Sequence, residues 1–198
     1  MTYKTLPPVG KVASHLPRLE FAPTPNMSSR FGVPIRKVWL HRWAGGQYDN
    51  IVHYLQNPHV EASAHLVYPG SQDWNHCAQL VPFGKKAWTE EVYNRSGVSI
   101  ECEDAIWLGH DAVGFCQLAR ITAYLLHRFG LPPVWAHTPK VVPFNYRRGM
   151  CRHADGGIPA GGHTQCPTTD LELWGQFVGR TQAEYRRGEF RKAPWGRY

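Results

Sequence analysis

The order of hydrophobic and polar positions gives its clearest strand signal at residues 36–46, RKVWLHRWAGG. Val38 and Leu40 alternate with Trp39 and His41, and a Gly-Gly pair closes the segment. Alternation with a period of two, followed by such a turn, indicates a β-strand. Further short apolar runs, separated by Gly, Pro and Asn, predict additional strands at residues 63–68, 76–83 and 97–103.

A helical period appears in residues 111–129. Leu118, Ile121, Leu125 and Phe129 fall on one face, and Gly130 follows as a stop signal. A shorter helix is predicted within residues 49–58, which begin with Asp and end with Pro. Another is predicted to start near residues 169–170 and to run past Trp174 and Phe177. Strands that alternate with helices predict an α/β fold, with a mixed central β-sheet flanked by helices.

The chain divides into three segments on composition. Residues 1–33 are proline-rich and lack periodicity, which predicts an extended N-terminal arm on the surface or a linker. Residues 34–182 hold the predicted elements and suit one domain with its own core. Residues 183–198 form a basic and aromatic C-terminal tail, which we expect to be disordered or to be a linker to another module.

Composition and charge narrow the classes of function. The net charge of +7 favours anionic partners, such as an acidic polymer or a nucleic acid. Nucleic acid ranks low because no dense Lys/Arg run is interleaved with aromatic residues. No segment approaches the roughly 18 apolar residues of a membrane span, and the first residues lack the apolar core of a signal peptide. The 5 cysteines have no CxxC pair and do not form a disulfide framework.

Two candidate metal ligands lie close together within residues 149–174, GMCRHADGGIPAGGHTQCPTTDLELW. His153 and Cys166 are suitable zinc ligands, and a catalytic zinc site takes three protein ligands and leaves a position open. His41, at the end of a predicted central strand, is the natural third ligand. The intervening loop can fold back at its glycines, which are Gly156, Gly157, Gly161 and Gly162. Spacing alone does not decide between a metal site and ordinary buried residues, and Cys151 is interpreted as a packing residue.

Six blocks, in order, resemble the zinc-dependent N-acetylmuramoyl-L-alanine amidases, a family with the type 2 amidase or peptidoglycan-recognition fold. They span roughly residues 36–178 and read KVWLHRWAGG, EASAHLVYPG, AQLVPFGKKAWTE, YNRSGVSIECE, MCRHADGG and HTQCPTTD. Each block is weak alone, but their order and spacing make the resemblance specific. The arrangement is most similar to the amidase domains of bacteriophage endolysins.

The resemblance implies that His41, His153 and Cys166 bind one zinc ion and that Glu101 is the catalytic acid and base. Some phage members use a Tyr just before the His of the second block, but this chain has Ala64 there, which favours Glu101. A zinc-bound water needs such a group to orient it and to protonate the leaving nitrogen. Glu101 as a structural carboxylate at a sheet edge is the alternative.

Other residues are assigned to the substrate by the same resemblance. Thr164 stands where members of the family help to hold the oxyanion, and the neighbouring His163 is a helper or an exposed loop residue. Trp88, Asn94 and His65 are expected to line the groove for the peptide stem, although ordinary packing would explain them almost as well.

The resulting hypothesis is a zinc amidase that cuts the bond between N-acetylmuramic acid and L-alanine in bacterial peptidoglycan. It would be a monomeric phage endolysin or its catalytic domain. It would be made in the host cytoplasm and released to the wall through a holin, with no membrane insertion and no nucleic-acid partner. A non-catalytic peptidoglycan-binding module of the same fold and a muropeptide-recycling amidase are the alternatives.

Overall fold

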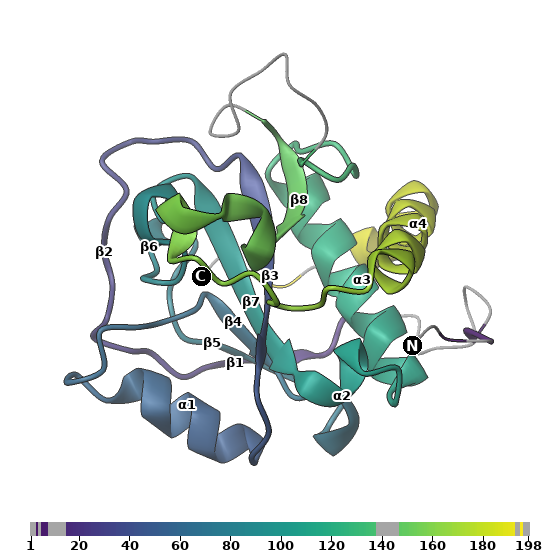
Figure 1. Cartoon of the computed structure of the whole chain (residues 1–198), viewed down its shortest axis with the longest axis horizontal. Coiled ribbons are helices and arrows are strands. Elements are labelled where there is room, and N and C mark those ends of the chain that lie inside the picture. The colour runs from purple at the N-terminus through teal and green to yellow at the C-terminus, as the bar shows by residue number, and fades with distance from the viewer. Residues whose placement is uncertain (1–2, 4, 8–14, 138–146, 193–194, 196–198) are drawn as a thin grey trace.

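A mixed six-stranded sheet forms the centre of the fold (Figure 1). The computed structural model describes residues 3, 5–7, 15–137, 147–192 and 195. The strands of the sheet follow the order β1-β5-β4-β7-β3-β8. β4 and β5 pair antiparallel, whereas the other neighbours pair parallel. Their bounds are β1 (Arg18–Phe21), β3 (Lys37–Trp43), β4 (Leu66–Tyr68), β5 (His76–Gln79), β7 (Gly97–Glu103) and β8 (Gly149–Arg152). The expected α/β fold with a mixed central sheet is confirmed.

Helices cover both faces of this sheet. They are α1 (Tyr48–Gln56), α2 (Asp104–Trp107), α3 (Ala112–Arg128) and α4 (Leu171–Arg187). Short elements complete the chain: β2 (Ser28–Ser29) pairs with β6 (Lys85–Lys86), and the 3₁₀ turns are η1 (Gly70–Gln72), η2 (Glu91–Tyr93), η4 (His153–Gly156), η5 (Ile158–Ala160) and η6 (Glu189–Lys192). No helix among the described residues is long and apolar enough to cross a membrane.

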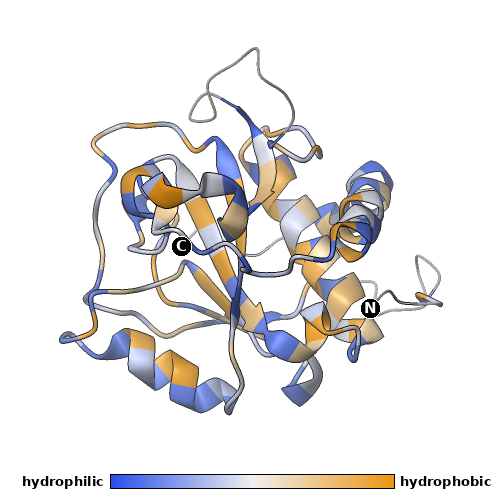
Figure 2. Cartoon of the chain, viewed as in Figure 1, coloured by the Kyte–Doolittle hydropathy of each residue, from blue (hydrophilic) through white to orange (hydrophobic). Residues whose placement is uncertain are grey.

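The alternation within β3 separates its side chains between two environments. Val38 and Leu40 belong to the larger core, together with residues of α3 and α4. Trp43 belongs to a second core, which holds Val52 and Leu55 of α1. α3 and α4 therefore cover one face and α1 covers part of the other (Figure 1). Figure 2 shows apolar residues concentrated in the central strands and in α3.

The predicted helix of residues 111–129 is confirmed as α3. Asp111 is its N-cap, and its carboxylate accepts a hydrogen bond from the Gly114 amide at 2.7 Å. Arg120 lies off the predicted apolar face, yet it is completely buried because α4 packs over it. There it forms an ion pair of 3.1 Å with Glu184 of α4. α4 itself begins after Asp170, as predicted, and the Asp170 carboxylate caps it.

The predicted arm is extended, but its described residues belong to the domain. β1 is an edge strand of the sheet and pairs with β5. Tyr3 and Leu16 are buried in the larger core. The Tyr3 hydroxyl donates a hydrogen bond of 2.8 Å to the Ile106 carbonyl. A domain boundary at residues 33–34 was therefore wrong, because apolar residues on the N-terminal side complete the core.

The expected basic tail also starts later than residue 183. α4 continues to Arg187, where Gly188 adopts a left-handed conformation (φ 63°) and ends it. Phe190 and Trp195 are buried against α3, and the Trp195 indole donates to the Pro17 carbonyl at 2.7 Å. A disordered tail was therefore wrong for residues 183–192 and 195, and the rest of the predicted tail lies outside the described residues.

Candidate active site

His41 and Glu101 reach the site from adjacent central strands. They are register partners in the parallel pair of β3 and β7, so their side chains leave the same face of the sheet. This face is opposite to α3 and α4, because Val38 and Leu40 point toward those helices. The sheet itself thus places a histidine beside a carboxylate, with 3.9 Å between His41 Nδ1 and Glu101 Oε1.

His153 and Cys166 come from the loop that follows β8. Gly157, Gly161 and Gly162 adopt positive φ angles of 59°, 90° and 74°, which L side chains rarely adopt. These glycines let the chain reverse between the two residues, as the sequence indicated. The Ala154 amide then donates a hydrogen bond of 2.8 Å to the Cys166 carbonyl, which joins the two ends of the loop.

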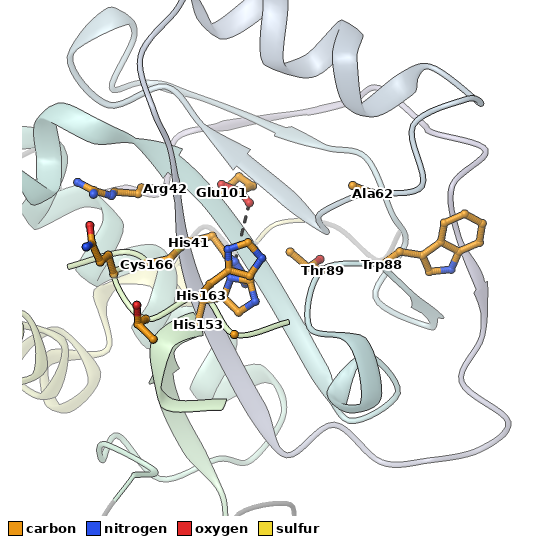
Figure 3. Close-up of a pocket in the computed structure, with 12 residues that line it drawn as sticks. His41, Arg42, Ala62, Trp88, Thr89, Glu101, His153, His163 and Cys166 are labelled. Carbon is orange, nitrogen blue, oxygen red and sulfur yellow. Dashed lines mark ion pairs between the residues drawn. The ribbon is translucent and has the colours of Figure 1, made fainter. Parts of the chain in front are cut away.

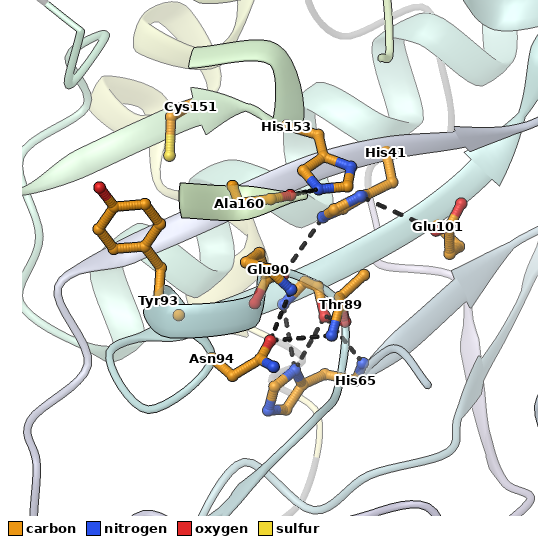
Figure 4. Close-up of polar contacts among 12 residues, drawn as sticks. His41, His65, Thr89, Glu90, Tyr93, Asn94, Glu101, Cys151, His153 and Ala160 are labelled. Carbon is orange, nitrogen blue, oxygen red and sulfur yellow. Dashed lines mark hydrogen bonds and ion pairs between the residues drawn. The ribbon is translucent and has the colours of Figure 1, made fainter. Parts of the chain in front are cut away.

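The structure brings His41, His153 and Cys166 together. One potential ligand atom from each lies within 4.8 Å of the others (Figure 3). The second nitrogen of each ring is engaged elsewhere: His41 Nε2 lies 3.2 Å from Glu90 Oε1, and His153 Nε2 lies 2.7 Å from the Ala160 carbonyl (Figure 4). A carbonyl or carboxylate oxygen accepts at that nitrogen, so Nδ1 of each ring keeps its lone pair.

This donor set fits a metal ion of the zinc type. Two imidazoles and a thiol are soft to borderline ligands, and three protein ligands leave a position for water or substrate. Hydrogen bonds to the second nitrogen of ligating histidines are a usual feature of zinc sites. The residues thus fit the metal that the resemblance implies.

Electrostatics keep both histidines neutral, as ligands must be. Burial, with a smaller contribution from the nearby His163, lowers the pKa of His41 to about 3. Burial likewise lowers the pKa of His153 to about 3, with a second contribution from His41. Burial raises the pKa of the Cys166 thiol to about 12, as does the Glu101 carboxylate. A metal ion must therefore displace the thiol proton when Cys166 binds it.

Glu101 combines burial with access to the groove. Burial, with a smaller contribution from the Glu90 carboxylate, raises its pKa to about 8. Its Oε2 has no hydrogen-bond partner among the described residues, although its side chain is only 17% exposed. A carboxyl group with a pKa near neutrality is suited to both the acid and the base step of hydrolysis.

A groove of about 500 Å³ opens over these residues. Its walls include His163 and Thr164, which are both exposed. These two residues belong to the loop between His153 and Cys166, here called the glycine-rich loop. The His163 ring stacks on His153 with 4.3 Å between ring centroids. The complete lining is His41, Arg42, Ala62, Trp88, Thr89, Glu101, His153, Gly162, His163, Thr164, Gln165 and Cys166.

Trp88 and Asn94 lie toward one end of the groove. Trp88 lines both the groove and an adjoining pocket of about 380 Å³, and Asn94 lines the pocket. The side chain of Asn94 has a structural task as well, because its Oδ1 accepts from the backbone amides of Thr89 and Glu90 at 2.8 and 2.6 Å. Direct contact of these two residues with substrate stays a prediction.

His65 lies beneath the groove. It is completely buried, and Arg30 Nη2 donates to its Nε2 at 2.6 Å. Its Nδ1 then faces the Ser99 hydroxyl at 3.1 Å. The expectation that His65 lines the substrate groove was therefore wrong, since its ring is enclosed by β7 and by the chain around Arg30. The same Ser99 hydroxyl lies 2.9 Å from Thr89 Oγ1, so His65 is connected to the groove wall through Ser99.

Among the residues at the site that sequence reasoning missed are Arg42, Thr89 and Glu90. Arg42 follows His41 on β3, lines the groove and forms an ion pair of 2.7 Å with Asp104. Thr89 lines the groove beside Trp88. Glu90 is buried against His41. The run Thr-Glu-Glu resembles a solvated turn, and only the tertiary fold shows which of its side chains point inward.

Comparison with known proteins agrees with this geometry. The family model described as N-acetylmuramoyl-L-alanine amidase matches residues 31–169. No curated protein matches the chain.

Solved structures share the fold at low sequence identity. The Staphylococcus aureus hydrolase AmiA, in complex with its ligand, superposes with a TM-score of 0.68 at 18% identity, over 91% of this chain and 89% of AmiA. A mutant endolysin from Bacillus subtilis gives 0.58 at 15%, over 84% and 99%. The N-acetylmuramoyl-L-alanine amidase LysC from Clostridium intestinale URNW gives 0.54 at 13%, over 81% and 97%.

The matched segment covers most of the chain and contains β3, β7, the glycine-rich loop and every residue of the His41, His153 and Cys166 cluster. The chain therefore belongs to the N-acetylmuramoyl-L-alanine amidase family.

Proposed function

We propose that this protein is a zinc-dependent amidase that hydrolyses the bond between N-acetylmuramic acid and L-alanine in bacterial peptidoglycan. The observation that carries the proposal is the convergence of His41, His153 and Cys166 on one point of the groove, beside Glu101. Family membership supports amidase activity on peptidoglycan.

The proposed reaction uses the groove as follows. Zinc held by the three ligands would activate the scissile carbonyl and a water molecule. Glu101 accepts a proton as the water oxygen bonds to the carbonyl carbon, and it delivers a proton to the nitrogen as the carbon–nitrogen bond breaks. Thr164 donates a hydrogen bond to the carbonyl oxygen while negative charge develops there, and His163 is the second donor in this proposal. The products are a lactyl carboxylate and a free L-alanine amino group.

The test uses purified peptidoglycan and measures both the loss of turbidity and the appearance of new amino-terminal L-alanine. We expect activity that a chelator removes and zinc restores. The H153A variant should fall to background, whereas H59A, at an exposed position after α1, should retain activity. Full activity in H153A would overturn the mechanism.

Binding of muropeptides without the release of amino termini would instead identify a non-catalytic module. All three proposed ligands are present here, and this favours the enzyme. Mass spectrometry of the digest distinguishes cleavage at L-alanine from cleavage elsewhere in the wall.

The biological setting is part of the same proposal. The likeness to solved endolysins supports a role as an endolysin or its catalytic domain. Release through a holin is the part of the proposal that needs its own test. Lysis of cells only when a holin is co-expressed would support it, and preference for soluble muropeptides over intact wall would favour the recycling alternative. A single monomer mass in light scattering would support the expected oligomeric state.

A further inference from the structure

Glu90 is a buried carboxylate that the proposed reaction does not use. Its side chain is completely buried, and its Oε2 has no hydrogen-bond partner among the described residues. Its other oxygen, Oε1, lies 3.2 Å from His41 Nε2. Burial of an acidic group with so few partners is unfavourable, so the contact with His41 requires an explanation.

The backbone around Glu90 is fixed so that the side chain points inward. Asn94 Oδ1 accepts from the Glu90 amide at 2.6 Å, and the Glu90 carbonyl accepts from the Tyr93 amide at 2.9 Å. The next residue, Glu91, has a left-handed φ of 49° and is exposed. Two consecutive glutamates therefore face different environments, and Figure 4 shows Glu90 directed at the His41 ring.

The contact determines which nitrogen of His41 faces the cluster. Burial raises the pKa of Glu90 to about 8, and the Arg30 guanidinium opposes this shift. When Glu90 is ionised, His41 Nε2 donates to the carboxylate and the lone pair stays on Nδ1, the atom on the side of Glu101. His153 is arranged in the same way by the Ala160 carbonyl. A carboxylate is the stronger acceptor of the two, and in zinc sites such a partner fixes the ring and increases the basicity of the ligand.

We propose that Glu90 is a positioning residue that holds His41 in the Nε2–H tautomer and in the orientation that binds the metal. The proposal rests on the proposed function for the identity of the metal site. It assigns Glu90 a role distinct from that of Glu101, because Glu101 lines the groove whereas Glu90 is enclosed beneath it.

Zinc affinity tests the proposal independently of catalysis. E90M removes the acceptor and nearly conserves the volume, and E90Q retains an acceptor oxygen. We expect the zinc dissociation constant of E90M, measured by competition with a chromophoric chelator, to rise about 10- to 100-fold. E90Q should recover most of this loss. Wild-type affinity in a folded E90M would overturn the proposal.

E184Q is the matched control, because Glu184 is also a buried carboxylate but pairs with Arg120 and Arg180 between α3 and α4. It should lower the melting temperature and leave zinc affinity unchanged. An equal loss of affinity in E184Q would show that any buried charge matters and would overturn the specific role of Glu90.

Nitrogen chemical shifts of the His41 ring give a second readout. In zinc-free wild-type protein, long-range ¹H–¹⁵N spectra should show the Nε2–H tautomer, and E90M should show a mixture. An Nδ1–H tautomer in the wild type would contradict the proposal even if E90M failed to fold. Because these measurements need no substrate, an inactive protein that binds zinc would refute the amidase reaction and leave the role of Glu90 standing.

Discussion

His41 and Glu101 are register partners on β3 and β7, with 3.9 Å between Nδ1 of one and Oε1 of the other. Both lie on strands buried in the centre of the sheet, so their relative position is set by main-chain hydrogen bonds. The loop that carries His153 and Cys166 then only has to reach a point that the sheet has already defined. A rigid element that holds a proposed ligand and the proposed acid–base group is favourable for catalysis, which requires both to be positioned closely.

Replacement of Glu101 by Gln should separate proton transfer from metal binding. Loss of a general acid and base reduces the rate by about 10²- to 10⁴-fold. The ligands His41, His153 and Cys166 are unchanged, so zinc content measured by elemental analysis should stay near one ion per chain.

E103Q is the matched control, because Glu103 lies two residues further along the same strand and its carboxylate binds Ser71 and Gln72 instead. Its rate of amino-terminus release should match the wild type. Wild-type activity in E101Q would transfer the acid–base role to another residue.

Separate substitutions of Thr164 and His163 show which of the two residues is the main hydrogen-bond donor to the oxyanion. T164V removes the donor at constant shape and should lower kcat about 10²- to 10³-fold, the usual effect of losing one oxyanion donor. T164S keeps the hydroxyl and should recover most of the rate. H163A should have the smaller effect, because the exposed His163 ring is assigned only a secondary donor role. Its other contact is a stack on the His153 ring. A larger loss in H163A than in T164V would reverse the two roles.

Local sequence patterns predicted the elements that carry strong periodic signals. β3 coincides with the alternating run that contains Val38 and Leu40, and α3 and α4 begin directly after the acidic N-cap residues Asp111 and Asp170. Two members of the His41, His153 and Cys166 cluster could also be predicted locally. His and Cys in one short loop indicate metal ligands, and the glycines between them indicate tight turns. His41 was a candidate third ligand from its place at the end of a predicted central strand, and the resemblance made that assignment more secure, because no local pattern specifies a contact between residues 41 and 153.

Contacts between distant segments explain what the sequence did not predict. β1 is short and lies in a proline-rich segment, and its pairing with β5 becomes visible only in the assembled sheet. Phe190 and Trp195 looked like parts of a basic tail, yet they pack on α3. His65 and Glu90 are polar residues whose burial depends on partners far away, Arg30 and His41. Propensity and periodicity carry no information about such partners.

Substitution of Gly156 tests whether the position of η5 controls the orientation of His153. A Cβ at this position would lie 2.3 Å from the Ala160 Cβ, which is far inside normal contact. η5 would have to move, and with it the Ala160 carbonyl that accepts from His153 Nε2. G156A should therefore weaken zinc binding and lower the melting temperature.

G175A is its control. Gly175 lies within α4, and a Cβ there meets no atom within 4 Å. Alanine is favoured over glycine in a helix by up to about 1 kcal/mol, so G175A should raise stability and leave zinc binding unchanged. Normal zinc affinity in G156A would show that the loop adapts without disturbing His153.

Acid should destabilise the protein through its buried histidines, and His65 provides the test. Burial, with a contribution from the adjacent Arg30 guanidinium, lowers its pKa from 6.5 to about 3. Between these values the unfolded chain binds a proton at this position and the folded chain does not. The contribution of neutral His65 is thus complete above pH 6.5 and is lost as the pH falls toward 3. Each such group steepens the fall in unfolding free energy by up to about 1.4 kcal/mol per pH unit.

H65Q removes this titration and keeps an oxygen that can accept from Arg30. Urea unfolding between pH 4 and 6 should therefore show a free energy of unfolding that falls less steeply with decreasing pH in H65Q than in the wild type. A pH-independent difference in stability between the two proteins does not affect this comparison of slopes. His41 and His153 would still contribute to the remaining slope, since burial lowers the pKa of each to about 3. Parallel curves for the two proteins would mean that His65 binds a proton in the folded state, in conflict with the donation that it receives from Arg30.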